Sequence, residues 1–258
     1  MTVLHVHDLG SPTGAPLLAV HGITGHGLRF RRSAAEGWPD RRTLAVDLRG
    51  HGRSTSDGPW SIAQHVTDLL DTMDAFGLAS ADVLGHSYGG AIALALVARA
   101  PERVARLVLL DPALHTSAEN GTANAMAAIA FGGFASPAEA MDARLMGNES
   151  IRDAVQEDLD EHLVQGGDGR WRYRFHPPAI ITGWGELCSP VPRLAATPST
   201  LVVAANGAPF VTPEIEADLR AQLGDRLSVV RLDCGHMVYW EDFAGTAAAV
   251  KAFLATHP

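Results

Sequence analysis

The stretch from Val83 to Leu96, VLGHSYGGAIALAL, decides the fold. An apolar run that predicts a strand leads into Ser87, and an alanine- and leucine-rich run that predicts a helix follows it. Ser87 is the central residue of a G-x-S-x-G pattern, which is informative when a strand precedes the serine and a helix follows it. Gly85 and Gly89 are small enough to let that strand and helix approach closely. We therefore expect a strained turn that raises the serine hydroxyl at the positive end of a helix, rather than a serine that only caps the helix.

Apolar runs and helical patterns alternate along most of the chain. The near-continuous apolar runs predict strands buried on both faces, and the segments between them predict helices. This alternation indicates the α/β class, with a mostly parallel, doubly wound sheet covered by helices on both faces. Strands are expected at residues 3–8, 16–20, 43–47, 81–86, 106–110, 200–205 and 227–232, and helices at 61–76, 88–100, 213–223 and 242–255.

The alternation is interrupted between about residues 114 and 197. This stretch is typical of helices rich in alanine, methionine and leucine, and it later contains GGDGRWRYRFHPP. An insertion at the carboxyl end of a strand lies over the edge where open α/β sheets bind small molecules. We therefore expect residues 114–197 to form a helical cap, inserted into a single domain whose core comprises residues 1–113 and 198–258.

Composition excludes several classes of protein. The net charge of −9 argues against nucleic-acid binding, which needs clustered lysine and arginine. No apolar run is long enough to span a bilayer, and MTVLHVHDLG does not have the pattern of a secretory signal, so we expect no membrane association and a cytoplasmic location. Two cysteines make no disulfide framework, and none of the twelve histidines falls in a common metal-binding motif, so no metal is expected. Composition does not reveal the oligomeric state.

Four segments in order carry a family resemblance. They are AVHGITGHG (19–27), DLRGHGRS (47–54), GHSYGG (85–90) and CGHMVYWE (234–241). With these segments the chain resembles the α/β-hydrolase fold superfamily, in particular its serine esterase- and lipase-like members with a helical cap. The resemblance implies a sheet of about eight strands, a Ser–His–acid triad and no cofactor.

Catalytic roles follow from the resemblance and from the chemistry. Ser87 would attack a carbonyl carbon, and His236 would act as the base that takes its proton. The backbone N–H groups of Ile23 and Tyr88 would form the oxyanion hole. His86 is interpreted as a packing residue and His21 as a residue that orders its loop.

The triad acid is the point at which the chain departs from the family pattern. Most relatives carry an aspartate at the position that falls here on Gly207, and no carboxylate stands there. One hypothesis is that Asp111, in LVLLDPA, supplies the acid from the end of the preceding core strand. The other is that no acid exists and Asn206 or a water orients the imidazole. Asp233 is close to His236 in sequence but poorly placed to hold its ring.

The function predicted from these residues is hydrolysis of a small hydrophobic carboxylic ester through an acyl-enzyme. The alternatives are a lactone, thioester or carbon–carbon bond hydrolase or a perhydrolase of the same fold, or a small-ligand-binding protein with little turnover. The partner is a small molecule, bound between the sheet edge and the cap. The predicted lining residues of its pocket are Thr24, Met126, Ile129, Phe134 and Trp184.

Overall fold

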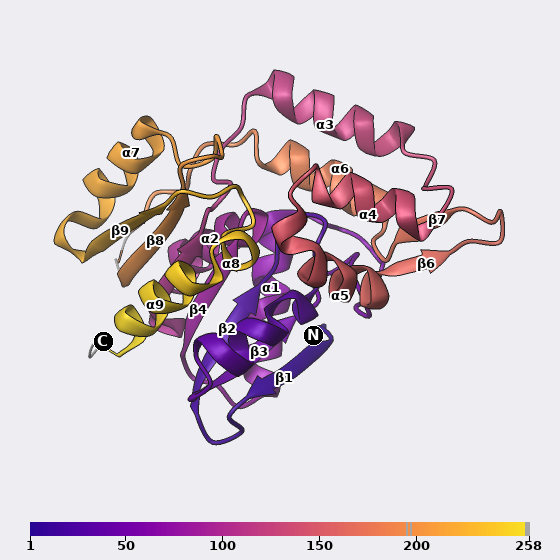
Figure 1. The fold of residues 1–258 in the computed structure, drawn as a ribbon. Coiled ribbons are helices and arrows are strands. Elements are labelled where there is room, and N and C mark those ends of the chain that lie inside the picture. The colour runs from indigo at the N-terminus through magenta and orange to yellow at the C-terminus, as the bar shows by residue number, and fades with distance from the viewer. Residues whose placement is uncertain (195, 197, 256–258) are drawn as a thin grey trace.

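A seven-stranded sheet forms the centre of the molecule in the computed structural model, which describes residues 1–194, 196 and 198–255 (Figure 1). The strand order is β1-β3-β2-β4-β5-β8-β9. Strand β1 runs antiparallel to β3, and the other neighbouring pairs are parallel. The strands are β1 (Val6–Gly10), β2 (Ala15–Val20), β3 (Arg41–Val46), β4 (Ala81–His86), β5 (Val104–Leu110), β8 (Ser199–Ala205) and β9 (Leu227–Leu232).

The α/β class and the mostly parallel sheet are confirmed, with two differences from the expectation. In the described part of the chain the main sheet has seven strands rather than about eight. The first strand begins at Val6 instead of residue 3, because its pairing starts opposite Val46, the last residue of β3.

Alternation along the strands divides the core into two layers. In β2, Leu18 and Val20 belong to one hydrophobic cluster, whereas Leu17 and Ala19 belong to the cluster on the opposite face. The first face packs against α1 (Ile62–Ala75), α2 (Tyr88–Arg99) and α7 (Pro213–Leu223), and the second against α8 (Val238–Glu241) and α9 (Phe243–Leu254). Short helical turns are η1 (Gly27–Phe30), η2 (Ser33–Gly37), η3 (Pro101–Arg103) and η5 (Gly224–Arg226).

Between β5 and β8 the chain forms a group of elements that contributes no strand to the main sheet in its described residues. Figure 1 shows these elements gathered on one side of the sheet. We call residues 118–186 the insert. They have their own hydrophobic cluster, which includes Phe134, Met141 and Leu159. The insert comprises α3 (Ala118–Ala130), α4 (Pro137–Leu145), η4 (Glu149–Ile151), α5 (Arg152–His162), β6 (Leu163–Gln165), β7 (Trp171–Tyr173) and α6 (Pro177–Glu186). No helix of the described chain is both long and apolar enough to cross a membrane.

Candidate active site

The turn between β4 and α2 holds Ser87 in a conformation that few residues adopt. Its φ of 54° and ψ of −122° lie far from both the strand and the helix values. Glycine is required on both sides because a Cβ on Gly85 would lie 2.4 Å from the Gly89 oxygen, and a Cβ on Gly89 would lie 2.2 Å from the Val20 oxygen. The strained turn predicted from the sequence is therefore present, and it leaves Ser87 at the amino end of a twelve-residue helix.

The loop that follows β2 passes beside this serine. A Cβ on Gly22 would lie 3.1 Å from the Ser87 Cβ and 3.5 Å from its Oγ, so only a glycine fits there comfortably. Two buried imidazoles hold the loop. His21 accepts a hydrogen bond from the Leu48 N–H at Nε2 (3.0 Å) and therefore donates from Nδ1 to the Gly22 oxygen (2.7 Å).

The second imidazole of this loop belongs to His51, whose Nε2 lies 2.8 Å from the Ile23 oxygen. The pKa of His21 lies well below its usual value, mainly because the ring is buried and to a lesser extent because of the neighbouring His51. His21 is therefore neutral at pH 7. The carbonyls of both Gly22 and Ile23 are thus fixed by side chains. This arrangement agrees with the interpretation of His21 as a residue that orders its loop.

Asp111 and His236 lie in direct contact although 125 residues separate them in the sequence. Asp111 Oδ2 is 2.6 Å from His236 Nδ1, while its Oδ1 accepts a hydrogen bond from the Ala205 N–H at 3.0 Å. The Asp111 side chain is completely buried, and the His236 side chain is 28% exposed. The His236 ring also lies against Phe210, with ring centroids 4.2 Å apart. Asp111, like Ser87, has a positive φ (38°).

The position of the usual family acid has no room for a side chain. A Cβ on Gly207 would lie 2.8 Å from the Cys234 oxygen, which also accepts a hydrogen bond from the Gly207 N–H at 3.0 Å. The neighbouring Asn206 donates its side-chain amide to Asp233 Oδ1. The side chains of Asn206 and Asp233 are therefore engaged with each other.

His86 makes a contact that the sequence interpretation missed. Its Nε2 donates a hydrogen bond to the His236 carbonyl oxygen (3.1 Å), and the two rings lie 4.7 Å apart. Burial, and then the proximity of His236, lower the pKa of His86 well below its usual value. The description of His86 as a packing residue is thus incomplete, since a neutral His86 also fixes the main chain that carries His236. The residue type could have indicated this contact from the sequence, because an apolar side chain would pack in the same place but could not donate a hydrogen bond.

Comparisons with known proteins identify the family of this chain. A family model described as alpha/beta hydrolase fold matches residues 15–243. The chain belongs to the α/β-hydrolase family. It is 36% identical over 256 residues to "Lipase LipV" of Mycobacterium tuberculosis, covering 97% of each chain. It is 28% identical over 249 residues to "Esterase YbfF" of Escherichia coli, covering 93% of each.

A solved structure, that of E-2-(acetamidomethylene)succinate hydrolase, superposes on this α/β hydrolase with a TM-score of 0.83. It has 24% identity, and the match covers 98% of this chain and 95% of the other. At that identity the likeness supports the fold alone.

The predicted pocket residues of this hydrolase are spread over several environments. Met126 and Ile129 on α3 are 57% and 59% exposed. Phe134 is buried in the hydrophobic cluster of the insert. Thr24 belongs to the loop beside Ser87, where its carbonyl oxygen accepts a hydrogen bond from the guanidinium of Arg29, and Trp184 packs from α6 against the core.

Helix α6 approaches the oxyanion-hole residues at Gly183. A Cβ on Gly183 would lie 2.9 Å from Ile23 Cδ1 and 3.4 Å from Tyr88 Cζ. The insert of this α/β hydrolase therefore contacts both residues predicted to form the oxyanion hole. Burial raises the pKa of the Tyr88 hydroxyl far above its ordinary value, so the phenol is neutral.

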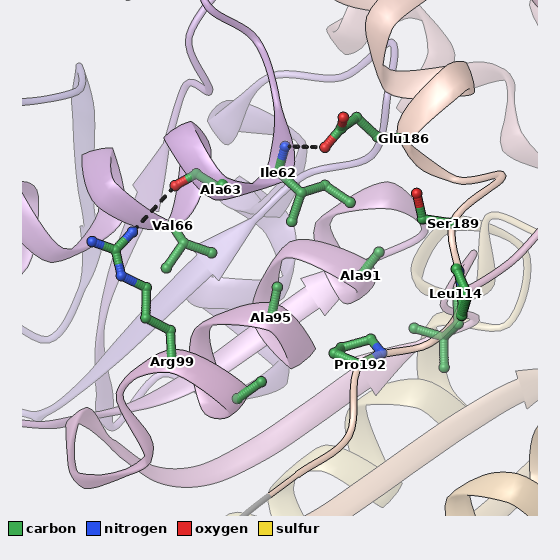
Figure 2. A pocket seen from close by; sticks show the side chains of 12 residues that line it. Ile62, Ala63, Val66, Ala91, Ala95, Arg99, Leu114, Glu186, Ser189 and Pro192 are labelled. Atoms are coloured by element: carbon green, nitrogen blue, oxygen red, sulfur yellow. Dashed lines mark hydrogen bonds between the residues drawn. The ribbon is translucent and has the colours of Figure 1, made fainter.

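A cavity of about 430 Å³ is bounded by α1, α2 and the segment after α6. Figure 2 shows the side chains that line it. Its lining is mostly apolar and includes Val66, Ala91, Ala95, Leu114 and Pro192. Neither Ser87 nor any of the five predicted pocket residues is among its described lining residues.

A buried charge cluster fixes the insert to the core. Asp158 of α5 accepts hydrogen bonds from Arg29 Nε (2.6 Å), Arg29 Nη2 (3.0 Å) and His26 Nε2 (2.9 Å), and Arg144 lies 3.3 Å away. Burial alone would raise the pKa of Asp158, but the charge of Arg29, the hydrogen bond from His26 and the charge of Arg144 together hold it well below its usual range. Since Arg29 lies in η1, the cluster fixes α5 close to the loop that passes Ser87.

Proposed function

We propose that the chain is a serine hydrolase that cleaves a small hydrophobic carboxylic ester through an acyl-enzyme. The observation that carries the proposal is the hydrogen bond between buried Asp111 and His236 Nδ1, in a chain whose Ser87 occupies a strained strand-to-helix turn. Ser87 is the nucleophile, His236 the general base and acid, and Asp111 the residue that orients the imidazole.

The hydrogen bond to Asp111 decides which nitrogen of His236 can act as a base. An ionised carboxylate only accepts hydrogen bonds, so Nδ1 carries the ring proton and Nε2 keeps its lone pair. That nitrogen takes the proton of the Ser87 hydroxyl while its oxygen attacks the ester carbonyl carbon. The backbone N–H groups of Ile23 and Tyr88 stabilise the oxyanion that forms, and each such donor contributes roughly 10²–10³ in rate.

His236 transfers the proton in both halves of the reaction, the acylation of Ser87 and the deacylation that follows. His236 gives the proton to the leaving alcohol as the tetrahedral intermediate collapses, which leaves the acyl group on Ser87. A water then attacks the acyl carbon while His236 accepts its proton, and collapse of the second intermediate returns that proton to Ser87 and releases the acid.

The substrate class is supported by the relatives and by the residues near the loop. The two relatives described above are a lipase and an esterase by name. We propose that the substrate binds next to Ser87, beside the Gly22–Ile23 loop, with Thr24 and Trp184 as lining residues. Met126 and Ile129 are too exposed, and Phe134 too occupied within the insert, to be part of this pocket.

The test is hydrolysis of a short-to-medium p-nitrophenyl ester series by the wild type and by Ser87→Ala. Covalent labelling by a fluorophosphonate probe is measured in parallel. We expect turnover and labelling in the wild type and neither in Ser87→Ala. Labelling without ester turnover would redirect the search to lactones, thioesters, carbon–carbon bond substrates and peracid formation. A folded wild type that is not labelled would contradict the enzyme proposal and favour a ligand-binding protein.

A further inference from the structure

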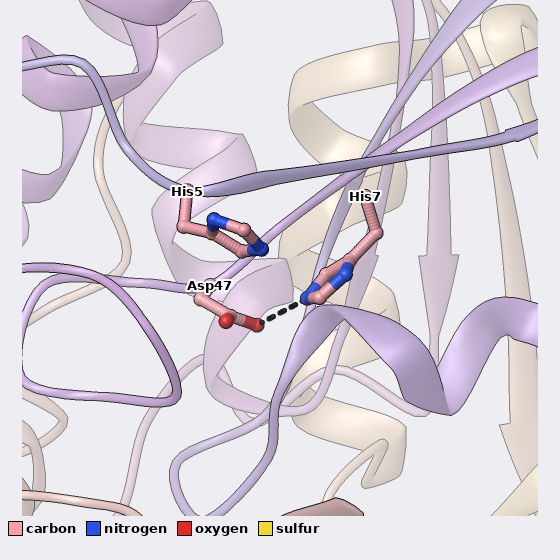
Figure 3. A group of neighbouring side chains, drawn as sticks. All are labelled: His5, His7 and Asp47. Carbon is pink, nitrogen blue, oxygen red and sulfur yellow. Dashed lines mark hydrogen bonds and ion pairs between the residues drawn. The ribbon is translucent and has the colours of Figure 1, made fainter.

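Three polar side chains that the sequence analysis left unconnected meet at the start of the sheet. Figure 3 shows the imidazoles of His5 and His7 beside the carboxylate of Asp47. Each residue offers one ligand-type nitrogen or oxygen atom, and these three atoms lie within 4.8 Å of one another. His7 Nε2 is 3.2 Å from Asp47 Oδ1, and the two histidine rings stand edge to face with centroids 4.6 Å apart.

The strand pairing explains why these residues meet. Val6 pairs with Val46, and the Asp47 N–H donates to the His5 oxygen (2.9 Å), so the antiparallel register continues to place Asp47 opposite His5. His7 lies two residues along from His5 and therefore projects from the same face. A His-x-His strand beside an aspartate on the neighbouring chain segment brings three metal-ligand side chains together without any local motif, which is why a search for common motifs misses it.

The carboxylate is already oriented by the main chain. The Gly27 N–H donates to Asp47 Oδ1 (2.8 Å), and the Arg53 N–H donates to Oδ2 (2.9 Å). Hydrogen bonds of this kind fix the direction of a carboxylate ligand and leave further lone pairs on its oxygens for an ion. Asp47 is buried, whereas His5 and His7 are partly exposed, so an ion can enter from solvent and retain water ligands.

We propose that His5, His7 and Asp47 form a binding site for a divalent first-row transition ion, with Zn²⁺ as the test ion. Two imidazoles and one carboxylate are the donor set that zinc accepts, whereas magnesium and calcium prefer sites made of oxygen alone. With bonds of about 2.0–2.1 Å, tetrahedral ligands lie about 3.3 Å apart, close to the 3.2 Å between His7 Nε2 and Asp47 Oδ1. The ion replaces the hydrogen bond between these two atoms, and water fills the remaining position.

An ion at this site would join two parts of the chain. His5 and His7 belong to the N-terminal segment, and Asp47 begins the loop that reaches Arg53. The same loop contains His51, whose ring holds the Ile23 carbonyl beside the predicted oxyanion hole. Binding therefore stabilises the folded state around this loop, and the melting temperature rises with free ion concentration.

The experiment uses untagged, chelator-treated full-length protein. Isothermal titration with Zn²⁺ measures affinity and stoichiometry, and the visible absorption of bound Co²⁺ reports inner-sphere coordination. The variants are His5→Ala and His7→Gln, of which the second keeps a hydrogen-bond donor to Asp47 and so protects the fold. His115→Ala, a change at an exposed histidine on another segment, is the matched control.

We expect one ion per chain in the wild type and in His115→Ala, with a Co²⁺ spectrum and a higher melting temperature on Zn²⁺ addition. Each of the other two variants should bind about 10²-fold more weakly or worse, because loss of residues that merely support a ligand already costs roughly 10–100-fold. Unchanged affinity in both variants, or no binding of one equivalent by folded wild type, would overturn the proposal.

Discussion

The substitution Asp111→Asn tests the triad most directly. The Asn side chain has the same shape, and its oxygen can still accept the Ala205 N–H that Asp111 Oδ1 accepts at 3.0 Å. Its NH₂ group then faces His236 Nδ1, where the carboxylate oxygen stood at 2.6 Å. Since an NH₂ group donates, Nδ1 must become the acceptor and the ring proton moves to Nε2. The nitrogen that should take the serine proton is thereby blocked.

The expected loss is large because the imidazole is held in the wrong tautomer while the geometry is preserved. A triad that loses its carboxylate in this way loses roughly 10⁴ in turnover, or about 5 kcal/mol of transition-state stabilisation. The value of kcat with a p-nitrophenyl ester measures the loss, and circular dichroism checks the fold. The matched control is Asp233→Asn, since Asp233 is the exposed acid nearest His236 in sequence and should be dispensable. If Asp111→Asn keeps turnover within about tenfold of the wild type, or if Asp233→Asn shows the larger loss, the assignment of the acid is refuted.

Three further substitutions examine the surroundings of the site. His86→Phe should retain the packing of the ring but leave the His236 carbonyl without its hydrogen-bond donor. We therefore expect the free energy of unfolding, measured in urea, to fall by about 1–3 kcal/mol and kcat to be lower. Wild-type values of both quantities would contradict a positioning role. Asp158→Asn should cost about 3–5 kcal/mol at pH 7, because the buried charge of Arg29 loses its partner. The pKa of Asp158 is lower in the folded state than in the unfolded state, so this stabilisation is present above the ordinary aspartate pKa of about 3.9 and is lost as the pH falls through the folded pKa. The difference in unfolding free energy between variant and wild type should therefore be smaller at pH 3 than at pH 7. An equal difference at both pH values would argue against the ion pair. Gly207→Asp should destabilise the fold and should not restore esterase activity to Asp111→Asn, because its Cβ would lie 2.8 Å from the main-chain oxygen of Cys234. Recovered esterase activity in the double variant would show that the loop adapts.

Local pattern in the sequence was sufficient for most of the fold. The apolar runs of β2, β4 and β5 are properties of neighbouring residues, so they can be recognised without knowing the contacts. Serine is a residue type that commonly caps the start of a helix, and the Ser61 Oγ accepts the Gln64 N–H at 3.2 Å at the start of α1. The strain at Ser87 followed from glycines two residues away on either side.

Contacts between distant segments were not predictable in the same way. The donation from His86 to the His236 carbonyl spans 150 residues, and the pairing of Asp158 with Arg29 spans 129. Four of the five predicted pocket residues are apolar side chains of the insert, but which face of α3 meets the core depends on the element that packs against it. Gly121 of α3 lies against Trp184 and Cys188, so the small residue faces inward and Met126 and Ile129 remain exposed.

If Asp111 is the triad acid, as we propose, the sheet topology permits this role to be filled from either of two strands. Strands β5, β8 and β9 are neighbours in parallel order, so Asp111, Gly207 and His236, which follow their carboxyl ends, lie at one edge of the sheet. The imidazole needs a buried carboxylate at Nδ1, and it does not matter which of the two strands supplies it. Asp111 reaches the end of β8, as its hydrogen bond from the Ala205 N–H shows. The Gly207 N–H donates to the Cys234 oxygen, and this oxygen lies where the side chain of a second acid would begin. An aspartate after β5 and a glycine after β8 therefore complement each other. When a chain of this family has both, the first hypothesis to test is that the triad acid has moved to the end of β5, and only then that the acid is missing.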